Sequence, residues 1–325
     1  MKPTFHHRPI NSPFDDPCVY VRVLREKRAL LFDLGYTTRL KPNDIQKITD
    51  VFVTHTHIDH FIGFDSLLRA LLRREAPLRI FGPYNITECI EGKLRGYTWN
   101  LIKEYPLKIE VFGIDEKHIS HAGFYAENCF NRIDYGKKPF DGTALKEQYF
   151  EVKAARLTHQ IPCLCFSLKE DFHINIDKAA LNMLALPVGP WLSEFKRAVR
   201  ENASEDTEFK ISGRVYTKKE LRDIAMITEG QKISYVVDSS IDEENIRKII
   251  TLAKDSDTLY CEAYFLEEDR ERAIERHHLT AKTAGMIARE AGVKNLIVMH
   301  FSPKYRECPD MPEKEAMMEY NRIVQ

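Results

Sequence analysis

Alternating apolar and polar residues predict β-structure in the first part of the chain. CVYVRVL (residues 18–24) alternates along its length, and ALLFDLG (29–35) is an apolar run that ends at a glycine, so the two segments together predict a hairpin. DVFVTH (50–55) predicts another short buried strand. In FDSLLRALLRRE (64–75) the leucines recur at helical spacing, which predicts a helix.

Strands and helices alternate in the second half of the chain. YFEVKAARLTH (149–159) predicts a strand, and the elements expected further along are strands at 232–240, 258–265 and 294–302 and helices at 242–256 and 280–292. Residues 181–230 interrupt this alternation, because they are polar and rich in glutamate. We expect them to form a protruding arm of a single domain that covers residues 1–325.

These two patterns predict an α/β protein. Helices can cover both outer faces of a hairpin-rich structure only if two sheets stack in the middle, so the combination favours a four-layer αββα sandwich. Periodicity alone also allows a single doubly wound sheet.

Composition limits the partners and the location. With 43% hydrophobic and 30% charged residues, the chain is typical of globular proteins with a sizeable core. Since no apolar run reaches the roughly 18–20 residues of a membrane span, and the first residues lack the apolar core of a signal peptide, we expect no membrane partner and a cytoplasmic location. The net charge of −1 gives no global basic field, so nucleic acid would need a local patch. The seven scattered cysteines predict reduced, mostly buried thiols.

Four predicted strands end in a residue that can bind a metal ion. These residues are His55, His159, Asp238 and His300. Strand ends that converge at one edge of a sheet bring distant residues together. The first of the four opens the string HTHIDH (55–60), in which three histidines and an aspartate lie within six residues. We interpret these residues as parts of one metal site.

Imidazole nitrogen and carboxylate oxygen suit zinc or manganese. Two such ions, roughly 3.5–4 Å apart, can activate a bridging water and stabilise both oxygens of a phosphoryl displacement. A lone histidine is more often a hydrogen-bonded structural residue, and we interpret the histidines outside such a context in that way: His6, His7, His118, His121, His173 and His277.

The string HTHIDH resembles the metal-binding signature of the metallo-β-lactamase superfamily, and further motifs resemble the ribonuclease Z family of tRNA 3′-processing endonucleases. LLFDLGYTTRL (30–40) is similar to the family's strand and turn before the signature, and HQIPCLCFSL (159–168) resembles the segment with its third metal histidine. The later matching segments are LPVGPWLSEFK (186–196), GRVYTKKEL (213–221), YVVDSS (235–240), CEAYF (261–265), HLTAKTAG (278–285) and NLIVMHFSPKY (295–305). The match runs from about Ala29 to Tyr305 in the family's order.

The resemblance implies a role for each matching residue. The implied ligands are His55, His57 and His159 for one zinc ion, Asp59, His60 and His300 for the other, and Asp238 as a bridge between them. Manganese is the alternative metal. The implied catalytic residues are Asp59, which would also accept a hydrogen bond from the water, His278, which would donate a proton to the leaving oxygen, and Glu262 beside it. The family is commonly dimeric, so a homodimer is expected.

The sequence departs from the family's pattern at several motifs. Where the family has Gly-Asp-Thr, this sequence has VDS (237–239). His-Glu-Ala-Thr is replaced by CEAY (261–264) and His-Ser-Thr by HLT (278–280), but none of these changes removes a ligand. The N-terminal segment offers Arg8, Pro9 and Asn11 without a counterpart of the family's glycine-rich turn and tRNA-positioning loop.

The predicted arm carries no net charge. Residues 181–230 contain eight Lys or Arg and eight Asp or Glu, whereas RNA phosphates favour a positive patch. The candidate substrate-binding residues of the arm are Trp191, Lys196, Arg197 and Arg200, which are equally compatible with a solvated helix face.

The sequence thus predicts a metal-dependent hydrolase that cleaves phosphodiesters, with tRNA precursor as the expected substrate. One alternative is a hydrolase on the same scaffold that acts on a small phosphodiester, such as a cyclic nucleotide, or on another ester. A second alternative is a non-catalytic metal-binding protein that interacts with RNA.

Overall fold

The computed structural model describes residues 4–24 and 26–323, which divide into two compact units. The smaller unit consists of residues 170–231, and the larger unit contains the described parts of residues 3–169 and 232–325. The predicted arm at about 181–230 falls inside the smaller unit. The organisation as a single domain with a protruding arm stays a prediction.

Two sheets form the middle of the larger unit. Among the described residues, the first sheet has eight strands in the order β1 (Phe5–Pro9), β2 (Val19–Val23), β3 (Arg28–Phe32), β4 (Ile48–Phe52), β5 (Leu78–Pro83), β6 (Lys108–Ile114), β7 (His118–Tyr125) and β8 (Arg132–Pro139). The second has six in the order β18 (Leu296–Met299), β17 (Thr258–Glu262), β16 (Lys232–Val236), β11 (Ile161–Glu170), β10 (Phe150–His159) and β9 (Thr143–Lys146).

The two sheets pack face to face through alternate residues of their strands. Phe32 of the first sheet stacks on Tyr235 of the second at 5.6 Å between ring centroids, and it also contacts Phe166 at 6.1 Å. These side chains belong to one buried apolar cluster that draws on both sheets. Burying their apolar surface contributes roughly 1.5–3 kcal/mol for each such side chain.

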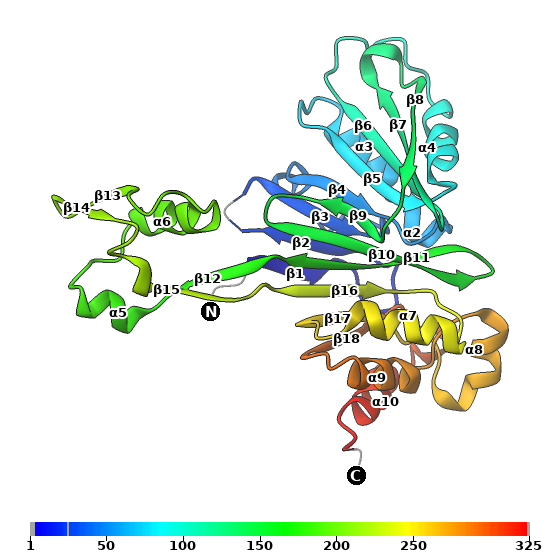
Figure 1. Ribbon diagram of the computed structural model, residues 1–325. Coiled ribbons are helices and arrows are strands. Elements are labelled where there is room, and N and C mark those ends of the chain that lie inside the picture. Colours follow the sequence, from blue (N-terminus) through cyan, green and yellow to red (C-terminus); the bar gives the residue numbers. More distant parts are fainter. Residues whose placement is uncertain (1–3, 25, 324–325) are drawn as a thin grey trace. The chain divides into compact units, whose positions relative to one another are not determined.

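Helices cover the outer face of each sheet (Figure 1). The helices beside the first sheet are α1 (Pro42–Ile45), α2 (Ile58–Phe61), α3 (Phe64–Leu71) and α4 (Ile86–Arg95). Those beside the second are α7 (Glu243–Ala253), α8 (Arg270–Arg276), α9 (Ala281–Glu290) and α10 (Met311–Tyr320). The layers run helix, sheet, sheet, helix, so the predicted αββα sandwich is confirmed and the single doubly wound sheet is wrong.

The predicted elements of the larger unit lie where the patterns placed them, with shorter ends. β2 and β3 pair as the expected antiparallel hairpin, and α3 ends at Leu71 rather than at residue 75. Asp242 and Thr280 cap α7 and α9 by accepting hydrogen bonds from backbone N–H groups of the first turn. These caps fix the starts of the two helices that follow site-bearing strands.

The smaller unit has its own core. Its elements are β12 (Phe172–Ile176), α5 (Lys178–Met183), α6 (Trp191–Arg200), β13 (Glu208–Ile211), β14 (Arg214–Thr217) and β15 (Ala225–Glu229). β12 pairs with β15 and β13 with β14, in both cases antiparallel. A separate buried cluster includes Trp191, Phe195 and Phe209, and it holds α6 against β13.

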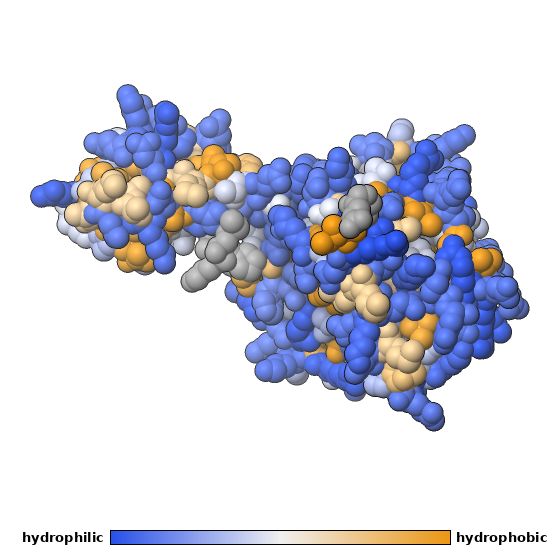
Figure 2. Space-filling view, turned by 90° about the horizontal axis from the view of Figure 1, so that it is seen from below, coloured by the Kyte–Doolittle hydropathy of each residue, from blue (hydrophilic) through white to orange (hydrophobic). Residues whose placement is uncertain are grey.

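The face shown in Figure 2 is dominated by hydrophilic residues, with apolar residues in small scattered groups. No cysteine forms a disulfide, and four of the seven are buried, in line with the predicted burial of most thiols. A search of the described residues finds no helix that combines the length and the apolar character of a membrane span.

Candidate metal centre

The predicted ligands lie at strand ends on one edge of the larger unit. His159 is the last residue of β10, His300 follows directly after β18, and Asp238 lies two residues after the end of β16. Asp238 and His300 have φ of 55° and 57°, a left-handed conformation that residues other than glycine seldom adopt. Such conformations concentrate at functional sites, where they turn a side chain out of the strand direction.

His55, His57, His159 and Asp238 form the first group. His55 follows β4 and is fully buried, and its Nε2 lies 2.9 Å from Nδ1 of His57, the residue that precedes α2. Oδ2 of Asp238 lies 3.2 Å from Nε2 of His55 and 3.5 Å from Nε2 of His159. Residues from β4, β10 and β16 thus meet around one point.

Asp59, His60 and His300 form the second group, and Asp238 connects it to the first. His60 Nε2 and His300 Nε2 each lie 3.4 Å from Oδ2 of Asp59. His60 Nε2 is also 3.3 Å from the same Asp238 oxygen that faces the first group. The structure therefore brings together all seven residues predicted as ligands, in the two predicted groups, with Asp238 between them. Their role as ligands stays a prediction.

These distances fit ligands around a tetrahedral ion. Zinc–nitrogen and zinc–oxygen bonds of about 2.0–2.1 Å place two tetrahedral ligand atoms about 3.3 Å apart. His300 Nδ1 and Asp238 Oδ1 are buried and lie 2.7 Å apart, and the buried His60 Nε2 lies 3.3 Å from Asp238 and 3.4 Å from Asp59. Polar atoms that face one another in a buried place are costly unless their hydrogen-bonding capacity is satisfied, and a cation bound among them would satisfy these atoms. The donor set of imidazoles and carboxylates fits zinc or manganese.

In several of the histidine ligand candidates, Nε2 faces the centre and Nδ1 is hydrogen-bonded to a neighbouring group. His60 Nδ1 donates to Oδ2 of Asp33 at 2.8 Å, and His159 Nδ1 donates to the carbonyl oxygen of His277 at 2.7 Å. Nδ1 of His55 lies 3.0 Å from Oγ1 of Thr54. Such bonds fix the tautomer in which Nε2 is free to bind a metal.

Asp33 is a positioning residue that the sequence analysis did not single out. It is fully buried directly after β3, with φ of 55°. Besides His60, it accepts hydrogen bonds from the backbone N–H of Thr54 at 2.7 Å and from the hydroxyl of Tyr235 at 2.9 Å. The signal in the sequence was a carboxylate at the end of the apolar run ALLF, before the histidine string.

The centre holds ionised carboxylates. Burial would raise the pKa of Asp59, but hydrogen bonds from His300 and His60 hold it well below its ordinary value. Burial likewise opposes ionisation of Asp238, and the charges of His300 and His60 keep its pKa low. Burial lowers the pKa of His55 to about 4, whereas Asp238 overcomes burial at His300 and raises its pKa to about 10. Ionised carboxylates buried among imidazole rings make an environment that attracts a divalent cation.

A second cluster adjoins the ligands. Oε2 of Glu262, at the end of β17, lies 2.8 Å from Nδ1 of His278, and its Oε1 accepts from the backbone N–H of Ser239 at 2.7 Å and of Leu279 at 3.2 Å. The ring of Tyr264 stacks on His278 with centroids 4.0 Å apart. Glu262 and His278 come close enough to Asp238 and His300 to be ligands as well. Because Glu262 already accepts three hydrogen bonds, we interpret it as the residue that orients His278.

The cluster opens into a pocket of about 550 Å³. Its lining includes His57, Asp59, His159, His278 and His300. His277, interpreted as structural from the sequence, contributes its carbonyl to His159, and its ring lies 2.8 Å from Oγ of Ser240. Five of the seven proposed ligands and the proposed proton donor therefore line one solvent-accessible space.

The predicted substrate-binding residues of the smaller unit all lie on α6: Trp191, Lys196, Arg197 and Arg200. Trp191 is buried and donates from its indole N–H to the carbonyl of Pro187. Arg200 pairs with the buried Glu170 at 2.9 Å, while Arg197 is exposed. Their role in binding substrate stays a prediction.

The N-terminal segment makes contacts within the larger unit. Arg8 of β1 lies over the ring of Tyr20, and the amide of Asn11 donates to the carbonyl oxygens of Asp16 and Tyr36. These contacts stabilise the entry to the first sheet.

Comparisons with known proteins agree with this site. Residues 13–71 match the model of the metallo-beta-lactamase superfamily. Ribonuclease Z of Deinococcus radiodurans is 29% identical over 287 residues, which cover 87% of this chain and 85% of that protein. Ribonuclease Z of Nanoarchaeum equitans is 30% identical over 285 residues, covering 86% of this chain and 76% of that protein.

Solved structures show the same fold. The metallo-beta-lactamase fold protein YhfI from Bacillus subtilis is similar with a TM-score of 0.57 at 15% identity, over 100% of this chain and 96% of that one. The short form of human tRNase Z is similar with a TM-score of 0.52 at 22% identity, over 93% of both chains. The chain therefore belongs to the ribonuclease Z family of metal-dependent hydrolases, within the metallo-β-lactamase superfamily.

Proposed function

We propose that this hydrolase cleaves tRNA precursors endonucleolytically at their 3′ ends. The observation that carries the proposal is the complete set of seven converging ligand candidates, with His278 beside them in the same pocket. The names of the relatives from Deinococcus radiodurans and Nanoarchaeum equitans support RNA as the substrate. The predicted homodimer and cytoplasmic location stay predictions.

Two metal ions fit the site. His55, His57 and His159 would hold one, Asp59, His60 and His300 the other, and Asp238 would contact both. When bound, such ions lower the pKa of a coordinated water from 15.7 to about 7 and stabilise negative charge on phosphoryl oxygens. Zinc suits the ligand set, and manganese is the alternative.

The remaining chemistry falls to side chains. Asp59 is 36% exposed at its side chain, whereas His60 and Asp238 beside it are buried, so Asp59 can both face the pocket and accept a hydrogen bond from the attacking water. A ribose 3′-oxygen leaves poorly as an alkoxide, so it needs a proton. His278 can supply that proton, because its Nδ1 is held by Glu262 and its side chain lines the pocket.

A small phosphodiester is the second candidate substrate. The observation that favours it is the equal number of basic and acidic residues at 181–230, together with the burial of Trp191. A folded RNA needs phosphate contacts away from the reacting bond, and this stretch of the smaller unit offers no excess of positive charge for them.

Side-by-side assays separate the two candidates. Zinc-loaded protein is incubated at low salt with a tRNA precursor and with a bis(nitrophenyl) phosphate, and Asp59→Ala serves as the control for contaminating nuclease. We expect cleavage of the precursor at a single 3′ position, lost in the control. Hydrolysis of the small ester without any cleavage of the precursor would refute the RNA assignment.

A further inference from the structure

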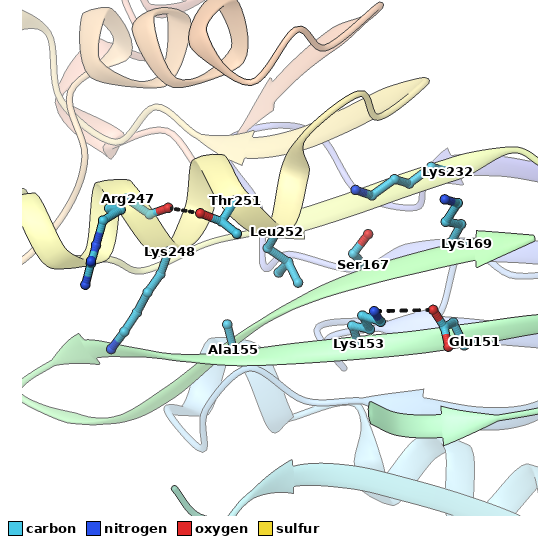
Figure 3. Close-up of a pocket in the computed structure, with 10 residues that line it drawn as sticks. All are labelled: Glu151, Lys153, Ala155, Ser167, Lys169, Lys232, Arg247, Lys248, Thr251 and Leu252. Carbon is cyan, nitrogen blue, oxygen red and sulfur yellow. Dashed lines mark hydrogen bonds and ion pairs between the residues drawn. The ribbon is translucent and has the colours of Figure 1, made fainter. Parts of the chain in front are cut away.

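A pocket of about 500 Å³ lies on the outer face of the second sheet, apart from the metal centre (Figure 3). Strands β10, β11 and β16 form its floor, and α7 forms one wall, from which Lys248 reaches toward the strands. The basic residues that line it are Lys153, Lys169, Lys232, Arg247 and Lys248. Glu151 is the one acidic residue in that lining, as far as the described chain extends.

The positive charge of this basic pocket is only partly compensated. Lys153 lies 3.6 Å from Glu151, and Lys248 pairs with Glu244 at 2.7 Å. Lys169 and Arg247 have no ion pair with any described residue. The pocket therefore presents more cations than it neutralises.

The positive charges that line the pocket affect Lys232. Its Nζ donates to the carbonyl oxygen of Lys254 at 2.6 Å, and its side chain is partly buried. Burial lowers its pKa, and the charges of Lys169 and Lys153 lower it further, against the opposing charge of Asp255. An anion bound among these residues would relieve the repulsion.

Lysines form part of the pocket floor although the strands of this floor are inner strands of the sheet, so their presence needs an explanation. Lysines often protect the exposed edge of a sheet from pairing with another chain. Here β10, β11 and β16 lie between β9 and β17, so edge protection does not apply. Their alternate residues Val152, Phe166 and Ile233 are buried between the sheets, while Lys153, Ser167 and Lys232 face the pocket.

We propose that this basic pocket binds backbone phosphates of the RNA substrate. The inference rests on the proposed function, and it answers the question of where the excess positive charge lies, since residues 181–230 have none. Long, flexible ammonium and guanidinium groups in an open groove suit repeated phosphates, which position a nucleic acid without reading its sequence. A small-molecule site would instead be mostly apolar with a few fixed polar groups.

The distance to the metal centre fits one RNA strand. Lys153 lies six residues before His159 on β10, and Lys232 lies six residues before Asp238 along β16. At about 3.3 Å per residue, each interval is roughly 20 Å. A folded RNA whose cleaved bond lies at the metal centre can therefore reach the pocket.

The test removes the two cations without an ion pair. Lys169→Ala/Arg247→Ala leaves no acidic partner unpaired, and the matched control, Lys137→Ala/Lys138→Ala, removes two exposed charges from β8 in the same unit. Binding of a labelled tRNA precursor is measured by fluorescence anisotropy from 50 to 200 mM KCl, with Asp59→Ala as a common background so that the RNA stays intact. Hydrolysis of bis(nitrophenyl) phosphate, measured without the Asp59 substitution, reports on the integrity of the metal centre.

Two lost phosphate contacts should reduce the salt dependence by a defined amount. The slope of log affinity against log salt should fall by about 2, so the fourfold rise in salt should weaken binding by the parent about 16-fold more than binding by the pocket variant. We expect the control to keep the parental slope and both variants to hydrolyse the small ester at the parental rate.

Three outcomes overturn the assignment: an unchanged slope in the pocket variant, an equal loss of slope in the control, or 1:1 binding of inorganic triphosphate at the pocket with an unchanged RNA slope. The last outcome would assign the pocket to a small anion. Precursor cleavage with an unchanged slope refutes the pocket alone, whereas pocket-dependent binding without any cleavage refutes the proposed function alone.

Discussion

Replacing Asp33 with asparagine should weaken one metal site and leave the fold nearly intact. Asp33 offers two acceptor oxygens, one facing the backbone N–H of Thr54 and the other facing His60 Nδ1 and the hydroxyl of Tyr235. An asparagine has one acceptor and one donor, so only one of these directions can keep its bond unchanged. Since the N–H of Thr54 is fixed as a donor, the new carbonyl oxygen should turn toward it.

The new NH₂ group then faces His60. The ring can accept a hydrogen bond at Nδ1 only if its proton moves to Nε2, and the hydroxyl of Tyr235 can rotate to accept as well. Every buried group keeps a partner, so the free energy of unfolding should change by less than about 1 kcal/mol. However, the proton now occupies His60 Nε2, the atom aimed at Asp59 and Asp238. Loss of such a supporting partner typically costs about 10–100-fold in metal affinity.

Zinc affinity can be followed by competition with a chromophoric chelator, and stability by urea unfolding of the metal-free chain. We expect Asp33→Asn to release one zinc ion per chain about 10–100-fold more readily while the ion at His55, His57 and His159 is retained. The matched control is Asp50→Asn, another fully buried aspartate, which pairs with Arg28 and Arg79 away from the centre. This control should lower stability and keep both ions. Unchanged zinc affinity in Asp33→Asn, within twofold, would refute the role of Asp33 and of His60 Nε2 in the second site.

Three further predictions concern the centre and the smaller unit. Elemental analysis should find close to two zinc or manganese ions per chain and activity should vanish on chelation; a chain that holds one ion or none after reloading would contradict the seven-ligand site. His278→Ala should lower the turnover of tRNA precursor by about 10²–10⁴ and that of a nitrophenyl ester much less, because nitrophenolate leaves without a proton. In this comparison His277→Ala is the control, since its backbone carbonyl still holds His159, and equal losses on the two substrates would show that His278 is structural. If α6 binds RNA, Lys196→Ala/Arg197→Ala should raise the KM for precursor at least threefold and leave hydrolysis of the small ester unchanged. Arg200 is kept in this variant because its loss would leave Glu170 buried without that partner.

The convergence of the ligand candidates could be predicted from the sequence because four of them follow strongly patterned strands. His159, Asp238 and His300 follow apolar runs, and parallel or neighbouring strands that end together bring such residues to one place. Asp33 lies at the same kind of strand end. It was missed because its partner is the histidine string itself, and no spacing in the sequence shows which ring nitrogen needs a hydrogen bond.

Features that depend on strand order were beyond the sequence. β10 and β11 are consecutive, but β16 joins them only after the 62 residues of the smaller unit, so the cations of the basic pocket come from separate segments. Trp191 and Arg200 were candidates for RNA contacts because their residue types suit that role. The structure also gives them local partners, Pro187 and Glu170, that periodicity does not reveal.

The metal centre and the basic pocket use the same strands in different ways. β10 and β16 carry pocket residues near their beginnings and deliver His159 and Asp238 at their ends. Alternate residues of both strands pack in the core between the two sheets, where Val152, Tyr235 and Ile233 are fully buried. Shifting either strand by one residue would turn every side chain to the opposite face, so the register that builds the metal centre also fixes the pocket. The interval of roughly 20 Å between them is therefore rigid. If phosphates bind in the pocket, this interval selects RNAs that are long and folded enough to span it, and a short ester is hydrolysed without any contribution from Lys169 or Arg247.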